Sequence, residues 1–349
     1  MGRQSARIRL NGKDHKEIRI SGNYHNSAHR DSNVLWEKIL EPEVYNGFNI
    51  TAVGYSEGVL FQAKGNFTVS WGDGQIQEYN YPELNYVQHS YQKVTHRQMD
   101  VWISGNVTDI SFSAANGIYS FNNALPPSLS GKTDFSTCFA YMNKRTTTIN
   151  KDLFKYCKSA QNFRSCFYNS ILAVIPEGLF RNCKNALNFN NCFGTNQIIA
   201  IPDRLFANLS LVTDFSQCFE GNQTTLKSIG KNVFENCSSV VSVGAMFSFT
   251  AISELPEGIF DSMINLENAK KVCFQCTGLK SVPYSLFDKC EKLNDVYYAF
   301  YNCKNITSKV PPLWEREWED LSKYHGCYYN CGPENDADIP WIGWSEADD

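Results

Sequence analysis

The chain has 349 residues, of which 42% are hydrophobic, 14% aromatic and 19% charged, a composition typical of a folded protein with large apolar faces. Its formal net charge of −4 argues against the basic footprint that binding to DNA, RNA or an anionic membrane requires. No run of eighteen apolar residues occurs, so no membrane insertion is predicted.

The first 40 residues show two short strand patterns, 6–10 and 17–21, on either side of an Asn11-Gly12 turn. The basic start at 1–7 has no apolar stretch that could serve as a signal peptide, so we expect no export by that route. A strand, a turn, a strand and a closing Leu-Trp-Glu resemble the β-elements that open tail and fibre proteins of gut phages. This segment is interpreted as an attachment region.

Residues 41–118 show alternating strand patterns at 49–53, 59–62, 67–71, 75–79, 98–104 and 108–113. Trp71-Gly72-Asp73-Gly74 predicts a tight hairpin, because Asp-Gly supplies the positive φ values of a primed turn. Together with the later His89-Ser90-Tyr91, this motif resembles a PKD-type β-sandwich, a fold that serves as a spacer or adhesive module. Asp73 is interpreted as a turn residue and His89 as a hydrogen-bonded structural residue, not as a metal ligand or base.

Residues 119–310 contain a repeat. An apolar-x-x-x-Leu-Phe unit recurs, and the spacing between its last aromatic residues is 26, 26, 28, 26, 27 and 27 residues. The units end at Phe154, Phe180, Phe206, Phe234, Phe260, Phe287 and Trp314. A second landmark falls between them at Cys138-Phe139, Cys166-Phe167, Cys192-Phe193, Cys218-Phe219, Met246-Phe247, Cys273-Phe274, Ala299-Phe300 and Cys327-Tyr328.

Each unit is predicted to contain a short helical turn that begins at the proline, then a polar turn, then a brief strand that ends at Cys-Phe. One unit cannot bury its aromatic side chain alone, so the units must stack. The expected fold class is therefore multi-domain: an N-terminal hairpin and β-sandwich, then a solenoid of about seven units of 26–28 residues, with a cap at 311–349.

The repeat resembles the BspA-like leucine-rich repeat family, because Phe-x-x-Cys follows the proline element at Phe154–Cys157, Phe180–Cys183, Phe234–Cys237 and Phe287–Cys290. The resemblance covers about residues 121–331. It implies adhesion or recognition rather than catalysis, in bacterial surface proteins or gut-phage virions.

All 13 cysteines lie between Cys138 and Cys331, an odd number. Ten occupy the two repeat columns, where Leu209, Met246, Met263 and Ala299 also stand, so we interpret them as buried reduced thiols. A disulfide framework and a zinc site at Cys273-x-x-Cys276 and Cys327-x3-Cys331 are the alternatives.

No P-loop, dinucleotide fingerprint or hydrolase motif occurs, so no catalytic residue, cofactor or metal is predicted. The acidic run Glu315, Glu317, Glu319 and Asp320, with Trp314 and Trp318, could suggest a glycosidase cleft. An amphipathic capping helix at the end of the solenoid explains the same residues.

The two residues between the core Phe and Cys of each predicted strand vary from unit to unit, and this face is the candidate binding surface. The candidate residues are Arg164, Asn190, Asn191, Gln217, Lys270, Tyr297, Tyr298, Tyr324 and His325. Tyrosines also gather towards the C-terminal end, where Trp341 and Trp344 follow, which suits carbohydrate stacking or a protein interface. Plain solvation of a polar face is the alternative.

The resulting hypothesis is a non-enzymatic bacteriophage virion protein, a tail, fibre or receptor-binding component. Its N-terminal region would contact other virion proteins, and its solenoid would bind a host-surface glycan or protein. The alternative is a BspA-like adhesin on a bacterial cell surface. Whether the chain forms a homo-oligomer stays open.

Overall fold

A computed structural model describes residues 47–53, 58–91, 98–142 and 148–332, together with the backbone of short strands near the N-terminus. The N-terminal strands form three antiparallel pairs: β1 (Ser5–Ala6) with β4 (Ile18–Arg19), β2 (Arg9–Leu10) with β3 (Lys13–Asp14), and β5 (Tyr24–Ser27) with β6 (Glu37–Leu40). The predicted turn at Asn11-Gly12 lies outside the described residues, as does most of the predicted N-terminal segment.

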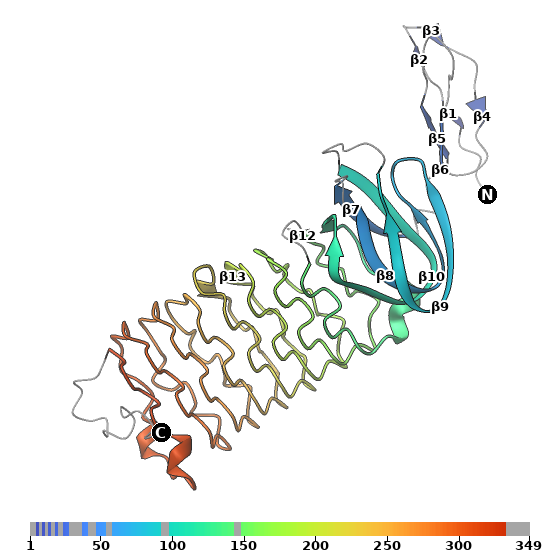
Figure 1. Cartoon of the computed structure of the whole chain (residues 1–349). Helices are drawn as coiled ribbons and strands as arrows, with labels where there is room; N and C mark the ends of the chain where they lie inside the picture. Colours follow the sequence, from blue (N-terminus) through green and yellow to red (C-terminus); the bar gives the residue numbers. More distant parts are fainter. Residues whose placement is uncertain are drawn as a thin grey trace.

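The described chain is all-β, and its only helices are three short 3₁₀ helices: η1 (Pro127–Gly131), η2 (Leu313–Glu315) and η3 (Leu321–Lys323). None of these could cross a bilayer. Figure 1 shows a β-sheet unit followed by an elongated stack of coils that ends near the C-terminus.

The sheet unit contains six strands in the order β12-β11-β7-β10-β8-β9. The strands are β7 (Phe48–Val53), β8 (Val59–Ser70), β9 (Ile76–His89), β10 (Gln98–Asn116), β11 (Ile118–Phe121) and β12 (Thr148–Ile149). All neighbours are antiparallel except β11 and β12, so the sheet is mixed. The predicted all-β character of this region is confirmed, and hydrogen bonds join its strands into one continuous sheet.

Two strands are longer than predicted because glycines bend them without ending them. The predicted strands 59–62 and 67–71 are one strand, β8, and 98–104 and 108–113 are one strand, β10. Gly65 in β8 has φ +125°, and a Cβ there would lie 2.1 Å from the carbonyl oxygen of Asn106 in β10. The ladder shifts register at this point, so the glycine marks a β-bulge.

The predicted hairpin between β8 and β9 is confirmed, but its turn differs from the prediction. The Trp71 N–H donates to the Gln75 carbonyl at 3.0 Å, and the left-handed residues are Gly72 and Gly74 instead of Asp73 and Gly74. Asp73 uses one carboxylate oxygen to accept the Gln75 N–H at 2.9 Å. The loop is therefore closed by an aspartate side chain and not by a two-residue primed turn.

The stack is built on an eight-residue segment that recurs in every coil and whose positions we number 1 to 8. The segments are 135–142, 163–170, 189–196, 215–222, 243–250, 269–276, 296–303 and 324–331. N–H groups at odd-numbered positions donate to carbonyls of the next coil, as from Phe163, Ser165, Phe167 and Asn169 at 2.8–3.0 Å. Backbone groups that would otherwise be buried and unpaired are thus satisfied between coils.

The predicted brief strand is wrong, because each segment consists of two consecutive tight turns. Within one coil the Cys166 N–H donates to the Phe163 carbonyl and the Tyr168 N–H to the Ser165 carbonyl, both at 3.1 Å. Only the preceding residue forms a β-bridge, as Asn162 does with Asn188. The proline-led part is also a turn and not a helical segment, with the Arg181 N–H bonded to the Gly178 carbonyl at 3.1 Å.

Positions 3 and 7 are left-handed in all eight segments. The residues are Thr137, Ser165, Asn191, Gln217, Ala245, Lys271, Tyr298 and Gly326 at position 3, and Tyr141, Asn169, Thr195, Gly221, Phe249, Gln275, Asn302 and Asn330 at position 7. Most of these side chains are not those that the left-handed region favours. The inter-coil hydrogen bonds must offset the conformational free-energy cost of the left-handed backbone in every coil.

Replacing a β-branched residue at such a position by glycine is therefore expected to stabilise the chain. Thr195→Gly should raise the free energy of unfolding by roughly 0.5–1 kcal/mol, since relief of the left-handed strain exceeds the added chain entropy of glycine. Urea denaturation measures this change. Exposed Thr277, whose φ is not positive, is the matched control, and Thr277→Gly should destabilise by a similar amount; a loss of stability in both variants would contradict the role given to position 7.

Aromatic rings at positions 1 and 5 form the core of the stack together with the Leu-Phe rings of the opposite side. Phe163 and Phe189 lie 5.0 Å apart with ring planes 2° from parallel, and Phe167 and Phe193 lie 5.3 Å apart at the same angle. Phe180 packs against both neighbouring position-1 rings, at 5.0 Å from Phe163 and 4.8 Å from Phe189. Positions 4 and 8 are buried in the same core.

One landmark is shifted by a residue relative to the sequence pattern. The Phe247 N–H donates to the Val272 carbonyl, as the Phe139 N–H donates to Cys166, so Val272 and Cys273 occupy positions 4 and 5. The assignment of Cys273-Phe274 to these two positions is therefore wrong. Phe274 stands at position 6 and is half-exposed, while Cys273 fills the phenylalanine column.

The sheet and the stack share one core and one hydrogen-bond pattern. At the end of β10 the Phe112 N–H donates to the Cys138 carbonyl at 2.6 Å and the Ala114 N–H to Ala140 at 2.8 Å, as positions 5 and 7 of a coil do. Ala114 is also left-handed, with φ 54°. The Phe112 and Phe139 rings stack at 5.5 Å, so β10 acts as the coil before the first coil.

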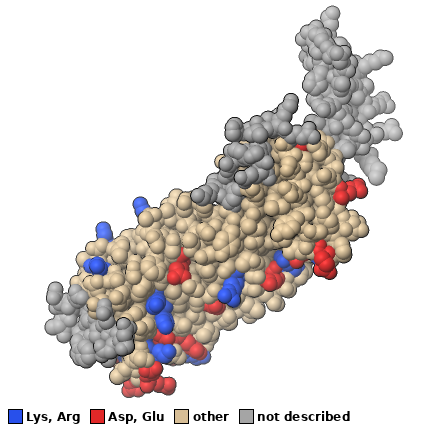
Figure 2. Space-filling model, in the orientation of Figure 1, with Lys and Arg blue, Asp and Glu red and all other residues tan. Residues whose placement is uncertain are grey.

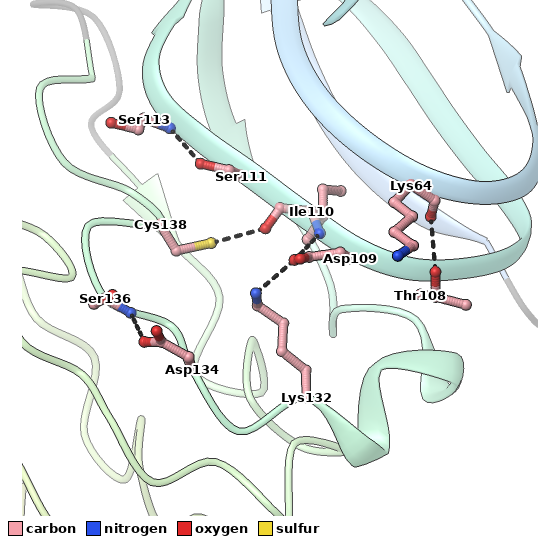
Figure 3. Close-up of polar contacts among 10 residues, drawn as sticks. All are labelled: Lys64, Thr108, Asp109, Ile110, Ser111, Ser113, Lys132, Asp134, Ser136 and Cys138. Atoms are coloured by element: carbon pink, nitrogen blue, oxygen red, sulfur yellow. Dashed lines mark hydrogen bonds and ion pairs between the residues drawn. The ribbon is translucent and has the colours of Figure 1, made fainter. Parts of the chain in front are cut away.

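Polar contacts secure the same junction (Figure 3). The Lys132 ammonium lies 2.5 Å from an Asp109 carboxylate oxygen, and the Cys138 thiol points to the Ile110 carbonyl at 3.2 Å. The Ser128 hydroxyl, in η1, donates to the Val107 carbonyl at 2.7 Å. Strand β10 is therefore held to the first coil by backbone, side-chain and ring contacts at once.

Candidate recognition surface

The side chains at positions 2, 3, 6 and 7 of the eight segments are exposed or half-exposed, with few exceptions, and we call this surface the coil face. They meet across positions and coils: Lys271 at position 3 lies over the Phe274 ring at position 6, and Tyr141 at position 7 contacts Tyr168 at position 6. The coil face is thus one continuous surface whose side chains vary over a constant core.

A column of Asp, Asn and Ser immediately before position 1 fixes the direction of the coil face. Its side-chain oxygens accept the N–H of position 2, as Asn162 does from Arg164 at 3.1 Å and Asn268 from Lys270 at 2.9 Å. The column members are Asp134, Asn162, Asn188, Asp214, Ser242, Asn268 and Asp295. These Asx-type turns start seven of the eight segments and leave the position-2 side chain pointing outwards.

The predicted binding residues fall on the coil face, with one exception. Arg164 and Lys270 are exposed, and Asn190, Asn191, Gln217, Tyr297, Tyr298 and His325 are half-exposed. Tyr324 is wrongly assigned: it stands at position 1, is only 2% exposed, and stacks against Trp318 with ring centroids 5.7 Å apart. Its ring closes the core of the last coil and cannot contact a partner.

The C-terminal aromatics divide between the core and the coil face. Tyr328 is buried at position 5 and donates its hydroxyl to the Pro311 carbonyl at 2.5 Å. Tyr301 and Tyr329, both at position 6, stack at 5.1 Å. Trp341 and Trp344 lie outside the described residues.

Sequence reasoning missed three residues of this surface, Phe249, Phe274 and Lys271. Phe249 and Phe274 contact each other edge to face at 5.4 Å, and Phe274 stacks on Tyr301 at 5.1 Å. Their spacing could have placed two of them on the coil face: Lys271 directly follows the candidate Lys270, and Phe249 follows the Met246-Phe247 landmark by two residues. The misplaced landmark at Cys273-Phe274 concealed it.

The coil face has a different charge from the chain as a whole. Among its positions stand three cations, Arg164, Lys270 and Lys271, and one carboxylate, Glu220, which leaves a net charge of +2 on a chain of −4. Burial raises the pKa of Glu220, while a hydrogen bond from Gln217 and the Lys271 charge oppose the rise. Elsewhere on the molecule, charges of both signs lie scattered along the stack in the view of Figure 2.

The acidic run near the C-terminus does not form a cleft with the tryptophans. Glu315, Glu317 and Glu319 are exposed, whereas Trp314 and Trp318 pack against the core. The Asp320 carboxylate accepts the Ser322 N–H at 2.9 Å and starts η3; hydrogen bonds from the Ser322 side chain and then from its backbone lower the pKa of Asp320. The predicted capping helix is absent from residues 311–332, where two short 3₁₀ turns stand in its place.

The 13 cysteines are all buried thiols without disulfide partners. In position 8, Cys276, Cys303 and Cys331 each point the sulfur at a position-5 carbonyl of the preceding coil, at 2.9, 3.0 and 2.7 Å. Asn196 makes the same contact, with its amide donating to the Phe167 carbonyl at 2.7 Å. Within the described ranges, no three potential ligand side chains are arranged to hold a metal ion.

Burial should protect these thiols from reagents in the folded chain. It raises the pKa of Cys138, Cys183, Cys237 and Cys290 to about 12, so almost no thiolate exists at pH 8. We expect no thiol to react with 5,5′-dithiobis(2-nitrobenzoate) within minutes under native conditions and all 13 to react in guanidinium chloride. Rapid reaction of even one thiol in the native chain would show that its column opens.

The Trp-Gly-Asp-Gly motif of the sheet forms a packed structural cluster. The His89 imidazole lies 2.8 Å from the second Asp73 oxygen and stacks on Trp71 at 4.7 Å. The Tyr91 hydroxyl donates to the Trp71 carbonyl at 2.9 Å. The Asp73 carboxylate, the His89 imidazole and the Tyr91 hydroxyl thus contact one another or the Trp71 residue, in line with the structural interpretation of Asp73 and His89.

No family model and no curated protein matches the chain. One solved structure, described as the Toll–Spatzle complex, a molecular hub in Drosophila development and innate immunity, aligns with 47% of the chain at 18% identity and a TM-score of 0.28. The chain spans 22% of the length of that protein, and at this score the likeness carries no argument about fold or function.

Proposed function

We propose that the chain is a non-enzymatic recognition protein whose stacked coils are a BspA-like leucine-rich-repeat solenoid and whose coil face binds a partner. One observation supports this most: positions 1, 4, 5 and 8 stay buried in every coil, and positions 1, 4 and 5 hold Phe, Cys and other apolar or aromatic residues, while positions 2, 3, 6 and 7 differ from coil to coil. A surface that varies over a constant scaffold is typical of repeat proteins that bind other molecules.

We further propose that the protein acts in a bacteriophage virion, as a tail, fibre or receptor-binding component. Support comes from the resemblance of the repeat to gut-phage and bacterial surface proteins and of the first 40 residues to phage tail β-elements. In this proposal the N-terminal region attaches to other virion proteins, and the stack projects the coil face towards the host. The alternative proposal is an adhesin on a bacterial cell.

Two experiments test these proposals separately. Fluorescently labelled full-length chain should adsorb to cells of a host strain, and a variant with Arg164→Glu, Gln217→Glu and Lys270→Glu on the coil face should adsorb much less. Equal adsorption of both proteins would count against recognition through the coil face. Mass spectrometry should find the protein in purified virions; its presence on the surface of uninfected bacteria instead would favour the adhesin.

A further inference from the structure

The fifth, sixth and seventh segments (243–250, 269–276 and 296–303) carry a dense group of aromatic side chains and two lysines on the coil face. We call Phe249, Lys270, Lys271, Phe274, Tyr298 and Tyr301 the aromatic–lysine patch. Lys270 lies over the Tyr297 ring at 4.9 Å from its centroid, and Lys271 over the Phe274 ring at 5.0 Å. Lys270 is exposed and the other members are half-exposed.

The rings of the patch already cover each other's faces. Phe274 stacks on Tyr301 at 5.1 Å with planes 15° apart, and Tyr297 stacks on Tyr298 at 4.0 Å and 20°. A neutral sugar binds aromatic residues mainly through an open ring face, and here each of these four rings already has another ring against one face. In such a stack the ring edges stay accessible to a ligand, and these edges carry the positive part of the ring quadrupole.

Charge and composition of the coil face indicate the chemistry of the ligand. Its net charge is +2 on a chain of −4, and its only carboxylate, Glu220, is held by Gln217 at 2.6 Å near Lys271. Amide side chains flank the patch, among them Gln217, Gln275 and Asn302. Lysines and ring edges favour anions, and amides bind hydroxyl groups.

A protein partner fits these observations less well. The centre of a protein interface gains most of its affinity by burying apolar surface, and the ring faces of this patch are already buried against one another. A ligand rich in hydroxyl and carboxylate groups needs no further apolar area. The outward positions of the coil face recur along the stack, so an extended polymer can contact several coils at once.

From this geometry we infer that the aromatic–lysine patch binds a linear acidic polysaccharide, one that carries carboxylates along its chain. The inference rests on the proposed recognition function and specifies its ligand class. Lys270 and Lys271 would pair with the carboxylates, while the ring edges and the amides at positions 3 and 7 would contact the sugar hydroxyls. Such binding weakens as salt screens the two lysine charges.

The experiment uses the full chain and two polymers with the same sugar backbone, one charged and one neutral: polygalacturonic acid and its fully methyl-esterified form. Affinity electrophoresis or calorimetry should detect binding of the acid at low salt, little binding of the ester, and a marked loss between 50 and 500 mM NaCl, as screening predicts. The double variant Lys270→Gln, Lys271→Gln should bind the acid about tenfold more weakly.

The matched control is the double variant Lys280→Gln, Lys289→Gln, which removes the same charge from exposed lysines outside the coil face and should bind normally. Phe274→Ser should weaken binding while circular dichroism shows an intact fold. Equal binding of acid and ester, no binding of either polymer, or equal loss in both lysine pairs would overturn the inference. A chain that adsorbs to host cells through its coil face but fails with the acid polymer would overturn only the ligand class and leave the proposed function intact.

Discussion

We expect the chain, stable at pH 7, to unfold between about pH 9.5 and 10.5, because its buried thiols stay protonated in the folded state. Burial raises the pKa of eleven of them above the ordinary value of 9.0. Below pH 9 both the folded and the unfolded chain hold these protons, so the full stability is present. Above pH 9 only the unfolded chain releases them, and the free energy of unfolding falls until the pH passes the folded pKa.

The size of this effect follows from linkage. Each thiol that stays protonated in the folded chain removes about 1.4 kcal/mol of stability per pH unit above 9. Eleven such groups would remove roughly 15 kcal/mol over one unit, as much as the whole stability of a typical domain. Urea titrations with reductant present, at several pH values from 8 to 10, measure the slope.

A variant that removes thiols serves as the control for lysine and tyrosine titration. Ala299 and Val272 stand at the same position 4 as Cys166, Cys192 and Cys218, so the column accepts small apolar side chains. Replacing these three cysteines by alanine should reduce the number of protons released on unfolding at high pH by about three. An unchanged slope would mean that other groups cause the alkaline unfolding.

The second large effect is expected at the junction, where Phe112→Ala should destabilise the sheet and the first coils together. The Phe112 ring contacts four other rings, Phe48, Phe61, Phe121 and Phe139, with centroids 5.0–5.9 Å away. Two of these partners belong to β7 and β8 and one belongs to the first coil. Truncation should cost about 3–5 kcal/mol, since the site is fully buried and cannot collapse easily.

Hydrogen exchange distinguishes a shared core from two separate ones. In Phe112→Ala, amides of β7, β8 and the segment 135–142 should all lose protection to a similar extent. Lys132→Met, which removes the half-buried ion pair with Asp109 and the ammonium contact with the Phe135 ring at the same junction, should cost about 1 kcal/mol. Loss of protection on one side only would show that the sheet and the stack unfold independently.

The sequence predicted the period and the buried columns, because these depend on residues that recur at fixed spacing. It did not predict the backbone of each coil, since positions 3 and 7 are left-handed while holding residues such as Tyr298 and Phe249. The residue types at these positions do not predict the left-handed conformation, because hydrogen bonds to the next coil impose it. The brief strand and helical turn that we predicted are replaced by tight turns for the same reason.

Two errors on the coil face have one origin, the use of residue type in place of register. Phe274 was placed in the core because it follows a cysteine, and Tyr324 on the surface because it lies among exposed tyrosines. Alignment on hydrogen bonds places Phe274 outside and Tyr324 inside. Gly65 misled in a similar way, since a glycine that bends a strand has the same sequence signature as one that ends it.

Each segment has buried positions 1, 4, 5 and 8 and outward positions 2, 3, 6 and 7. Every coil is therefore a structural unit of the same kind. A whole coil can be duplicated, deleted or replaced without disturbing the columns of its neighbours, because each coil presents the same donors and acceptors on both sides. The number of coils in the stack and the side chains on the coil face can therefore change independently. Such a scaffold lets substitutions on the coil face accumulate without loss of the buried core that the fold depends on.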